Sequence, residues 1–434
     1  MDAEFGAGVM RKVLLRLVPL TMLLNIIKDI DRSNISYAAL QMNSQLGFTA
    51  SVYGFAAGIF FIGYVAFEIP SNLVLARVGA RRWIGRIMIT WGLVSMTMAS
   101  IEGPTSFYAM RFLLGMAEAG FLPGILYYYT LWFPARARGK AIAWFSVTAA
   151  VTNIIAAPLS TGLLALDGLF GLKGWQLMFL VEGLPAVILG LIVFSLLTDK
   201  PEDATWLDSR EKTWLMEALS GERAIKRASG ATTLRQGLLD GRVWLTALVC
   251  FFLICANFGA VFWLPQIIKS FGGISTMQVG LLAILPYLVG AIAMVLWGRH
   301  SDATGDRKWH LVASALVAAL GFVAAGLAPP GAPSFLGLCL AAAGTWSMAG
   351  VFWTLPSDFL AGSAAAGGFA LINSIGTTGG FFGPFIMGFV RDRTQSFTGS
   401  LLVLAGFALV AACLSALLKN QLPTRRERLA SASG

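Results

Sequence analysis

Four charged side chains lie within five consecutive residues in the middle of the first long apolar segment of the chain, residues 14–40. They are Lys28, Asp29, Asp31 and Arg32. About 20 apolar residues span the hydrocarbon core of a bilayer, so this segment is long enough to cross a membrane and its charges fall near the centre. Burying one charge there costs at least ~2.5–3.5 kcal/mol on insertion scales, so charges at membrane depth usually face a polar cavity and have a function.

Two interpretations of this cluster are open. Lys28 lies three residues before Asp31 and four before Arg32, on one helix face. Asp29 likewise lies three residues before Arg32, so the four charges could neutralise one another and simply hold helices together. Leucines would pack there at lower cost than two ion pairs. The alternative is a cation that binds an anionic solute, beside a carboxylate that can accept a proton.

The composition indicates an all-α polytopic membrane protein. Hydrophobic residues make up 57% of the 434 residues and charged residues 12%, whereas soluble domains contain about 25% charged residues. The apolar segments are also much longer than the strands of about ten residues that form outer-membrane barrels. The lipid bilayer is therefore an expected partner.

The distribution of basic residues predicts the orientation of the chain. Of the 32 Lys and Arg residues, 25 fall in segments that the predicted topology places on one side, 3 within helices and 4 on the other side. This asymmetry is the positive-inside pattern and predicts that both termini are cytoplasmic. The net charge of +10 is thereby explained without a nucleic-acid partner.

The hydropathy pattern predicts twelve membrane-spanning helices in two pseudo-symmetric bundles of six. The spans are expected at residues 14–40, 51–75, 83–100, 105–133, 141–166, 175–197, 243–270, 276–297, 309–328, 333–356, 364–390 and 398–418. The predicted domains are an N-terminal bundle (1–198), a charged cytoplasmic linker with an interfacial helix (199–241), a C-terminal bundle (242–420) and a cytoplasmic tail (421–434). In such a pair of halves a solute site forms at the midplane between them.

A second charged pair, Arg111 and Glu118, occurs in the fourth predicted span. Seven residues are two helical turns, so both side chains share one face. A carboxylate in a low-dielectric site is more readily protonated than in water, and a nearby arginine opposes this. Whether Glu118 is protonated can therefore depend on which other group binds the arginine. The alternative, a permanent Arg111–Glu118 bridge, is disfavoured because seven residues separate the Cα atoms by ~10.5 Å.

Several motifs resemble one known family. They are Asp31-Arg32-Ser33-Asn34, Glu68-Ile-Pro-Ser-Asn72, Arg111-Phe-Leu-Leu-Gly-Met-Ala-Glu-Ala-Gly120, Trp263-Leu-Pro-Gln266, Gly298-Arg-His-Ser-Asp302, Leu355-Pro-Ser-Asp358 and Ala370-Leu-Ile-Asn-Ser-Ile-Gly376. Together they make the chain similar to the anion:cation symporter family of the major facilitator superfamily, on the branch of tartrate, aldonate and 4-hydroxyphenylacetate carriers. The resemblance covers nearly the whole chain and implies an alternating-access carrier. We expect a monomer in the cytoplasmic (inner) membrane of a bacterium.

The resemblance also implies roles for individual residues. By motif position, Arg32 would bind the substrate carboxylate, Asp31 and Glu118 would carry protons, and Arg111 would support Glu118. Arginine suits the first role because its guanidinium stays charged and binds carboxylates with two hydrogen bonds.

The substrate-binding set is less specific. Relatives commonly have Asn-Tyr where this chain has Lys28-Asp29. If Lys28 faces the cavity, two cations could bind a dicarboxylate such as tartrate. If Asp29 neutralises Lys28, the only change from the relatives is the loss of the aromatic side chain that they have at this position. Further candidates at membrane depth are Tyr64, Gln266, Trp353 and Asn373, which suit a polyhydroxylated acid but could equally make interhelical hydrogen bonds. Glu102, Asp167 and Glu182 are expected at the membrane interface.

Three residues are expected to act in gating. The superfamily's loop motif, a charge latch between helix ends, occurs twice in degenerate form. The first copy keeps Arg77 but has Ala76 where an aspartate is expected, and the second keeps Asp302 but has Ala303 in place of a basic residue. Asp358 follows the tenth span and would serve the inner gate or cap a helix.

These observations predict a symporter that imports a small organic anion together with protons. The anion would be a sugar acid, a dicarboxylate such as tartrate, or an aromatic acid. A facilitator or exchanger without proton coupling is the alternative, and a substrate-sensing receptor on a carrier fold is a more distant one. An enzyme is not expected, because the sequence shows no nucleophile–base pair or cofactor loop, and its four cysteines and two histidines lack metal-ligand spacing. The proton is the expected coupling ion, without a cofactor or metal.

Overall fold

The computed structural model describes residues 2–228, 239–356 and 362–418, which are helical almost throughout and contain no β-strand. Nine spans in these ranges are long and apolar enough to cross a membrane. Each of the twelve predicted spans corresponds to a helix, except that the fourth is divided between two. The prediction of an all-α, multi-pass membrane protein is confirmed.

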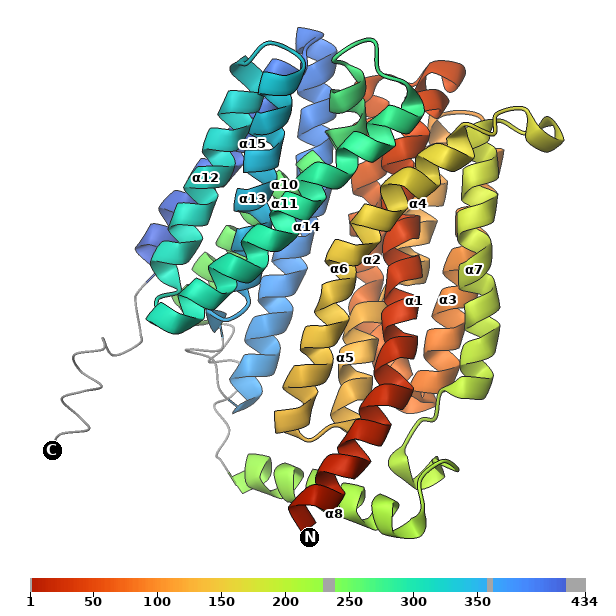
Figure 1. Ribbon diagram of the computed structural model, residues 1–434, viewed down its shortest axis with the longest axis vertical. Coiled ribbons are helices and arrows are strands. Elements are labelled where there is room, and N and C mark those ends of the chain that lie inside the picture. Colours follow the sequence, from red (N-terminus) through yellow and green to blue (C-terminus); the bar gives the residue numbers. More distant parts are fainter. Residues whose placement is uncertain (1, 229–238, 357–361, 419–434) are drawn as a thin grey trace, which may run out of the picture. The chain divides into compact units, whose positions relative to one another are not determined.

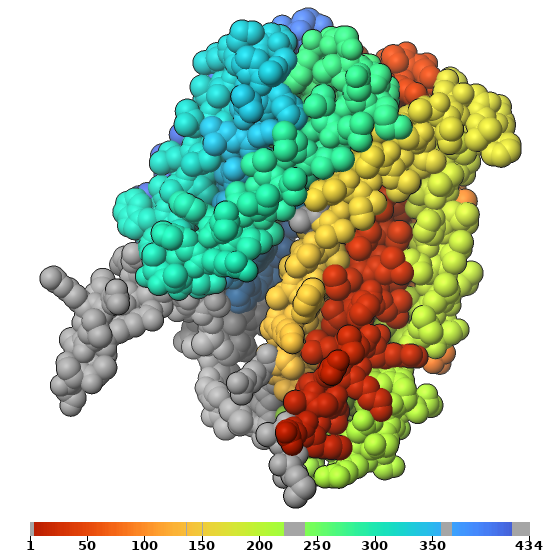
Figure 2. Space-filling view, in the orientation of Figure 1, coloured from red at the N-terminus to blue at the C-terminus, as the bar shows by residue number. Residues whose placement is uncertain are grey.

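The chain forms two compact units, and the first contains residues Met1–Gly230 and Phe262–Ile284. Its helices are α1 (Asp2–Leu46), α2 (Ala50–Val78), α3 (Ala80–Thr97), α4 (Pro104–Glu118), α5 (Phe121–Trp132), α6 (Ala135–Leu164), α7 (Gly174–Leu196) and α8 (Ser209–Ala228), with short 3₁₀ helices η1 (Met98–Ser100), η2 (Leu169–Gly171) and η3 (Pro201–Asp203). On the face seen in Figures 1 and 2, α1 lies between α6 and α7, and both pack against it. Helix α1 is therefore central to this unit.

Helix α1 also extends well beyond a membrane. Its 45 residues would measure ~68 Å, more than twice the ~30 Å hydrocarbon core. The extra length near the N-terminus contacts α8, which lies across the end of the unit (Figure 1). There the Lys12 ammonium pairs with Glu211 at 2.8 Å.

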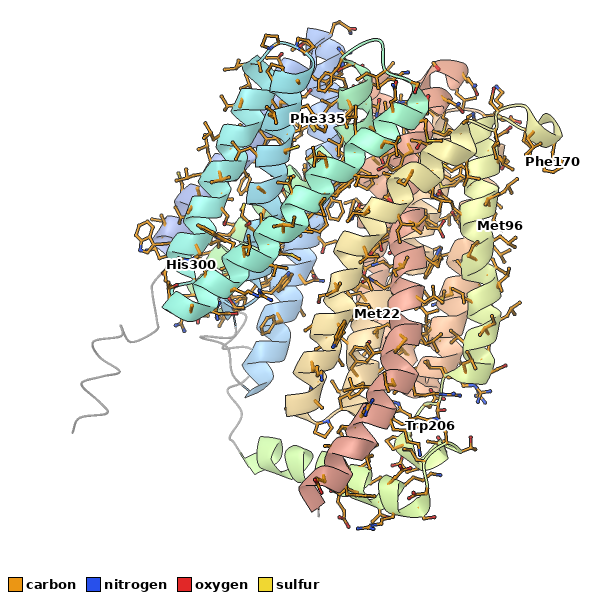
Figure 3. All side chains as sticks on the ribbon, in the orientation of Figure 1. Met22, Met96, Phe170, Trp206, His300 and Phe335 are labelled. Carbon is orange, nitrogen blue, oxygen red and sulfur yellow. The ribbon has the colours of Figure 1, made fainter. Side chains whose placement is uncertain are left out.

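Phe170, 84% exposed, lies at the opposite end of this unit from Trp206 (Figure 3).

Helices α2 and α4 approach closely at two glycines. A Cβ atom at Gly63 would collide with the backbone of Phe112 on α4, and one at Gly115 would collide with the backbone of Phe60 on α2. Small residues at such contacts allow backbones in a membrane to pack directly. This contact brings the polar groups of α4 against α2.

The fourth predicted span, 105–133, is not one continuous helix. Helix α4 ends at Glu118 and α5 begins at Phe121, because Gly120 adopts a left-handed conformation with φ of 86°. Such a φ is accessible mainly to glycine. The Ser71 hydroxyl donates to the Ala119 carbonyl at 2.7 Å and satisfies one carbonyl that the break frees. Glu118 is therefore the last residue of a helix.

The second unit contains residues Ala231–Val261 and Leu285–Gly434. Its helices are α10 (Gly241–Lys269) up to residue 261, α11 (Thr276–Thr304) from residue 285, α12 (Lys308–Leu327), α13 (Ala332–Phe352), α14 (Gly362–Thr394) and α15 (Phe397–Leu417). Helix α12 packs against α13 and α15, and α14 packs against α15.

The end of α10 and the start of α11 group with the first unit rather than the second. The Tyr53 hydroxyl of α2 donates to the Phe262 carbonyl at 2.7 Å, and the Tyr53 and Trp263 rings meet edge to face with centroids 4.9 Å apart. This grouping differs from the predicted domains, which assign all of 242–420 to one bundle. The domain limits stay a prediction.

Candidate functional site

Arg32 on α1 forms an ion pair with Glu118 at the end of α4. The Glu118 side chain is 2% exposed and the Arg32 side chain 19%. The Arg32 guanidinium also lies over the rings of Phe60 and Tyr64 on α2, at 5.1 and 5.4 Å from their centroids. Aromatic faces attract cations, so this site suits a guanidinium even where little water reaches it.

Arg111 does not make the bridge to Glu118 that was considered as an alternative, since no ion pair between them occurs in the described structure. Its side chain is fully buried, and it donates to the carbonyls of Ala56 and Ala57 on α2 at 3.2 and 3.3 Å. Its guanidinium also lies 4.9 Å from the Phe60 ring centroid. Arg111 thus fastens α4 to α2 and helps to define where Glu118 lies.

Asp31 points away from Arg32, toward α3. Its carboxylate accepts hydrogen bonds from Trp91 Nε1 at 2.6 Å, from Ser95 Oγ at 2.9 Å and from Asn34 Nδ2 at 3.4 Å. Asp31 is 1% exposed. The i,i+3 pair with Lys28 that the sequence left open is not formed, so in the described chain this carboxylate accepts from hydroxyl, indole and amide donors and pairs with no cation.

Lys28 pairs instead with its neighbour Asp29, at 2.8 Å between Nζ and Oδ1. The Lys28 side chain is 6% exposed and lies 6.0 Å from the Phe121 ring centroid. Asn25 bridges Asp29 to Thr148 on α6 through hydrogen bonds of 3.1 and 2.7 Å. Of the two arrangements left open by the sequence, this is the one in which Asp29 neutralises Lys28.

The other substrate-binding candidates are divided between the two units. Tyr64 is buried on α2 beside Arg32, as described above. In the same unit, Gln266 accepts a hydrogen bond of 3.4 Å from Asn43. Trp353, 43% exposed, and Asn373 on α14 belong to the second unit.

The first of the gating residues, Arg77, is exposed in the last turn of α2. An acidic residue from outside the motif, which the sequence pattern did not reveal, lies at the turn that follows Arg77. The Asp199 carboxylate accepts the Arg81 backbone N–H at 2.8 Å, at the start of α3. A Cβ atom at Gly79 would meet this carboxylate at 2.8 Å. Asp199 follows α7 and is far from the motif in the chain, so only the fold identifies it.

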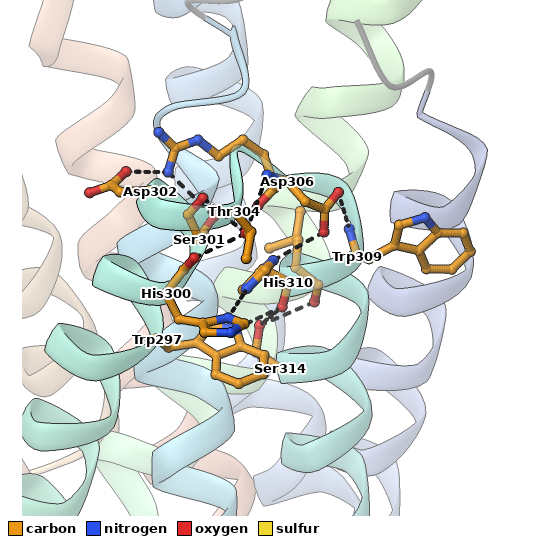
Figure 4. Close-up of polar contacts among 11 residues, drawn as sticks. Trp297, His300, Ser301, Asp302, Thr304, Asp306, Trp309, His310 and Ser314 are labelled. Carbon is orange, nitrogen blue, oxygen red and sulfur yellow. Dashed lines mark hydrogen bonds and ion pairs between the residues drawn. The ribbon is translucent and has the colours of Figure 1, made fainter. Parts of the chain in front are cut away.

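In the second copy of the loop motif, Arg307 takes the place of the missing basic residue. Its Nη1 lies 2.5 Å from Asp302 Oδ1. Figure 4 shows that both histidines of the chain lie beside this pair, with His300 Nδ1 2.7 Å from His310 Nε2, and His310 Nδ1 3.0 Å from Asp306 Oδ2. Asp358 lies outside the described residues.

Glu182 is a residue that the sequence analysis placed wrongly at the interface. It is 3% exposed in α7 and accepts the Ser160 hydroxyl of α6 at 2.7 Å. The available signal was its position: it is the one charged residue in the sequence from 177 to 197. Over the described ranges, no group of three or more His, Cys, Asp or Glu side chains is placed to hold a metal ion.

Comparison with known proteins agrees with this architecture. Residues 21–384 match the Major Facilitator Superfamily. The chain is 46% identical over 430 residues, 99% of each chain, to a protein of Agrobacterium vitis named "Putative tartrate transporter". It is 42% identical over 403 residues, 93% of each chain, to the "Quinolone resistance transporter" of Acinetobacter baumannii. Its fold is similar to the inward open conformation of the xylose transporter XylE from E. coli, with a TM-score of 0.75 at 16% identity over 96% and 99% of the two chains. The chain is therefore a membrane transporter rather than an enzyme, and it belongs to the anion:cation symporter-like branch of the Major Facilitator Superfamily.

Proposed function

We propose that this transporter imports a small organic anion together with protons by alternating access. The observation that carries the proposal is the Arg32–Glu118 ion pair at membrane depth. A buried cation whose partner is an ionisable carboxylate can exchange that partner for the carboxylate of a substrate. The name of the Agrobacterium vitis relative supports tartrate as the first acid to test.

The coupling follows from competition for one guanidinium. A substrate carboxylate that binds Arg32 displaces Glu118, whose side chain is 2% exposed. An isolated carboxylate is costly in such surroundings and becomes neutral by accepting a proton. Anion binding and protonation of Glu118 then favour each other. After the anion and the proton leave, the Arg32–Glu118 pair forms again.

The remaining residues have supporting roles in this proposal. Asp31 would carry a further proton, since it is buried and its recorded donors are uncharged. Tyr64 would position the anion beside Arg32, and Gln266, Trp353 and Asn373 would add polar contacts to it. Lys28 would bind a second carboxylate only by releasing Asp29. We place Arg77, Asp302 and Asp358 at the gates. The protein would act as a monomer in a bacterial inner membrane, with both termini in the cytoplasm.

The proposal can be tested in proteoliposomes that contain a pH-sensitive dye. Tartrate, galactonate, 4-hydroxyphenylacetate and phthalate are added singly to the outside. Internal acidification by one acid, which Arg32→Ala abolishes, supports anion–proton symport and identifies the substrate class. Labelled uptake without acidification, unaffected by an imposed pH gradient, would instead identify a facilitator or exchanger.

A further inference from the structure

Glu182 is a buried carboxyl group that the proposed mechanism does not use. It lies on α7 next to Gly183, where α7 packs closely on Gly92 of α3. One carboxyl oxygen, Oε1, accepts the Ser160 hydroxyl at 2.7 Å. The other, Oε2, is buried and has no hydrogen-bond partner among the described residues.

No basic side chain pairs with Glu182 in the part of the chain that the structure describes. Helices α1, α3 and α6 and the 3₁₀ helix η1 pack against α7. Helix α1 presents another acid, Asp31, to Glu182. Beyond α1, the basic residues of these elements whose side chains the structure describes are Arg81, Arg82 and Arg86 in the first seven residues of α3, and Arg138 and Lys140 in the first six of α6. The guanidinium of Arg86 stacks on Trp83 at 3.9 Å, and η1 has no charged residue.

Asn34 connects the two acids. Its side chain is fully buried on α1, interacts with Glu182, and donates from Nδ2 to Asp31 Oδ1 at 3.4 Å. Its carbonyl oxygen Oδ1 is the second acceptor of this cluster that lacks a donor in the described structure. Asn34 Oδ1 and Glu182 Oε2 are thus two buried acceptors without a donor in the described structure, and buried acceptors are normally satisfied.

A single proton resolves this arrangement. When Glu182 is protonated, Oε2 is no longer an unsatisfied anionic acceptor, and the Asn34 amide continues to donate to Asp31. When Glu182 is ionised, a second negative charge is buried near Asp31 with only neutral donors, which is strongly unfavourable. We propose that Glu182 is a further proton-binding site of the transporter, joined to Asp31 by Asn34.

This inference rests on the proposed function and extends it. Asp31 is the chain neighbour of Arg32, so displacement of either side chain during transport alters the hydrogen bonds that Asn34 can offer Glu182. A proton held at Glu182 would then move with those held at Asp31 and Glu118. We expect more than one proton to accompany each anion.

The first experiment detects the proton without requiring transport. The infrared C=O stretch of protonated carboxyl groups is recorded for the purified protein in lipid at neutral pH. We expect Glu182→Gln to remove one component of this band, and Ser160→Ala to shift that component but retain it. A band that is unchanged in Glu182→Gln would overturn the proposal. Glutamine preserves the size and the Ser160 hydrogen bond of the residue, so the variant should fold.

The second experiment measures the number of protons moved with each tartrate. In proteoliposomes, the pH gradient that just balances a fixed tartrate gradient and membrane potential gives this number. We expect Glu182→Gln to lower it by about one and Ser160→Ala to leave it unchanged. A wild-type number in Glu182→Gln would overturn this inference and leave the symport proposal intact. Tartrate movement without protons in the wild type would instead refute both.

Discussion

The substitution Glu118→Gln tests the proposed competition for Arg32 most directly. It removes the negative charge that holds the guanidinium and keeps the size of the side chain. In the wild type, an arriving carboxylate must replace a charge-assisted bond to Glu118, worth about 1.5–3 kcal/mol, whereas a neutral amide offers about 0.5–1.5 kcal/mol. The pair is largely buried, with the Glu118 side chain 2% and the Arg32 side chain 19% exposed, so solvent screening reduces this difference only in part.

The expected gain in anion binding is therefore about 1–1.5 kcal/mol, or roughly 5- to 13-fold tighter binding at a pH where Glu118 is ionised. In the wild type, affinity should rise as the pH falls, because protonation of Glu118 frees Arg32. That dependence should be lost in Glu118→Gln. Isothermal titration calorimetry with tartrate, repeated across pH, measures both effects.

The same variant should lose proton-driven accumulation while it retains counterflow, since it can bind the anion but cannot carry this proton. Glu102→Gln, at an exposed glutamate, is the matched control and should behave as wild type in both assays. If Glu118→Gln bound tartrate more weakly, or still concentrated it against its gradient in response to pH, the competition argument would be refuted.

Three further predictions concern binding and packing. Arg32→Ala should weaken tartrate binding at least ~100-fold, because two charge-assisted hydrogen bonds are lost; calorimetry that finds near-normal affinity would contradict its role. Gly115→Ala should cost about 1–3 kcal/mol of stability by forcing the α2 and α4 backbones apart, and should lower the thermal midpoint. Gly406→Ala, which has open space around it, is the control and should have little effect. Asp199→Ala should cost about 0.5–2 kcal/mol through loss of the hydrogen bond to the first turn of α3; a thermal midpoint equal to that of the wild type would contradict this, and a wild-type midpoint in Asp199→Asn, which keeps an acceptor oxygen, would argue against a role for the carboxylate charge there.

The sequence predicted the helices well because a bilayer imposes a length on each of them. A segment that crosses a hydrocarbon core must satisfy its own backbone hydrogen bonds and carry about 20 apolar residues. The sequence did not predict the break at Gly120, because hydropathy shows only one long apolar segment there. Glycine is frequent inside membrane helices, and nothing local distinguishes one that adopts a positive φ from one that packs against a neighbour.

The sequence by itself determined that this chain is an all-helical membrane transporter and that the middle of α1 carries charges which hydrocarbon cannot solvate. It did not determine their partners. Arg32 pairs with a residue 86 positions away, and Asp31 accepts from α3 rather than from the lysine one turn before it. Glu182 of α7 is enclosed by α1 and α6, and only the packing of these helices brings its neighbours Asn34 and Ser160 to it. Spacing along one helix limits which charges can meet, but the packing of neighbouring helices decides which of them do. An unpaired polar group at membrane depth is unfavourable, so each one pairs with the donor or acceptor that the fold places within reach.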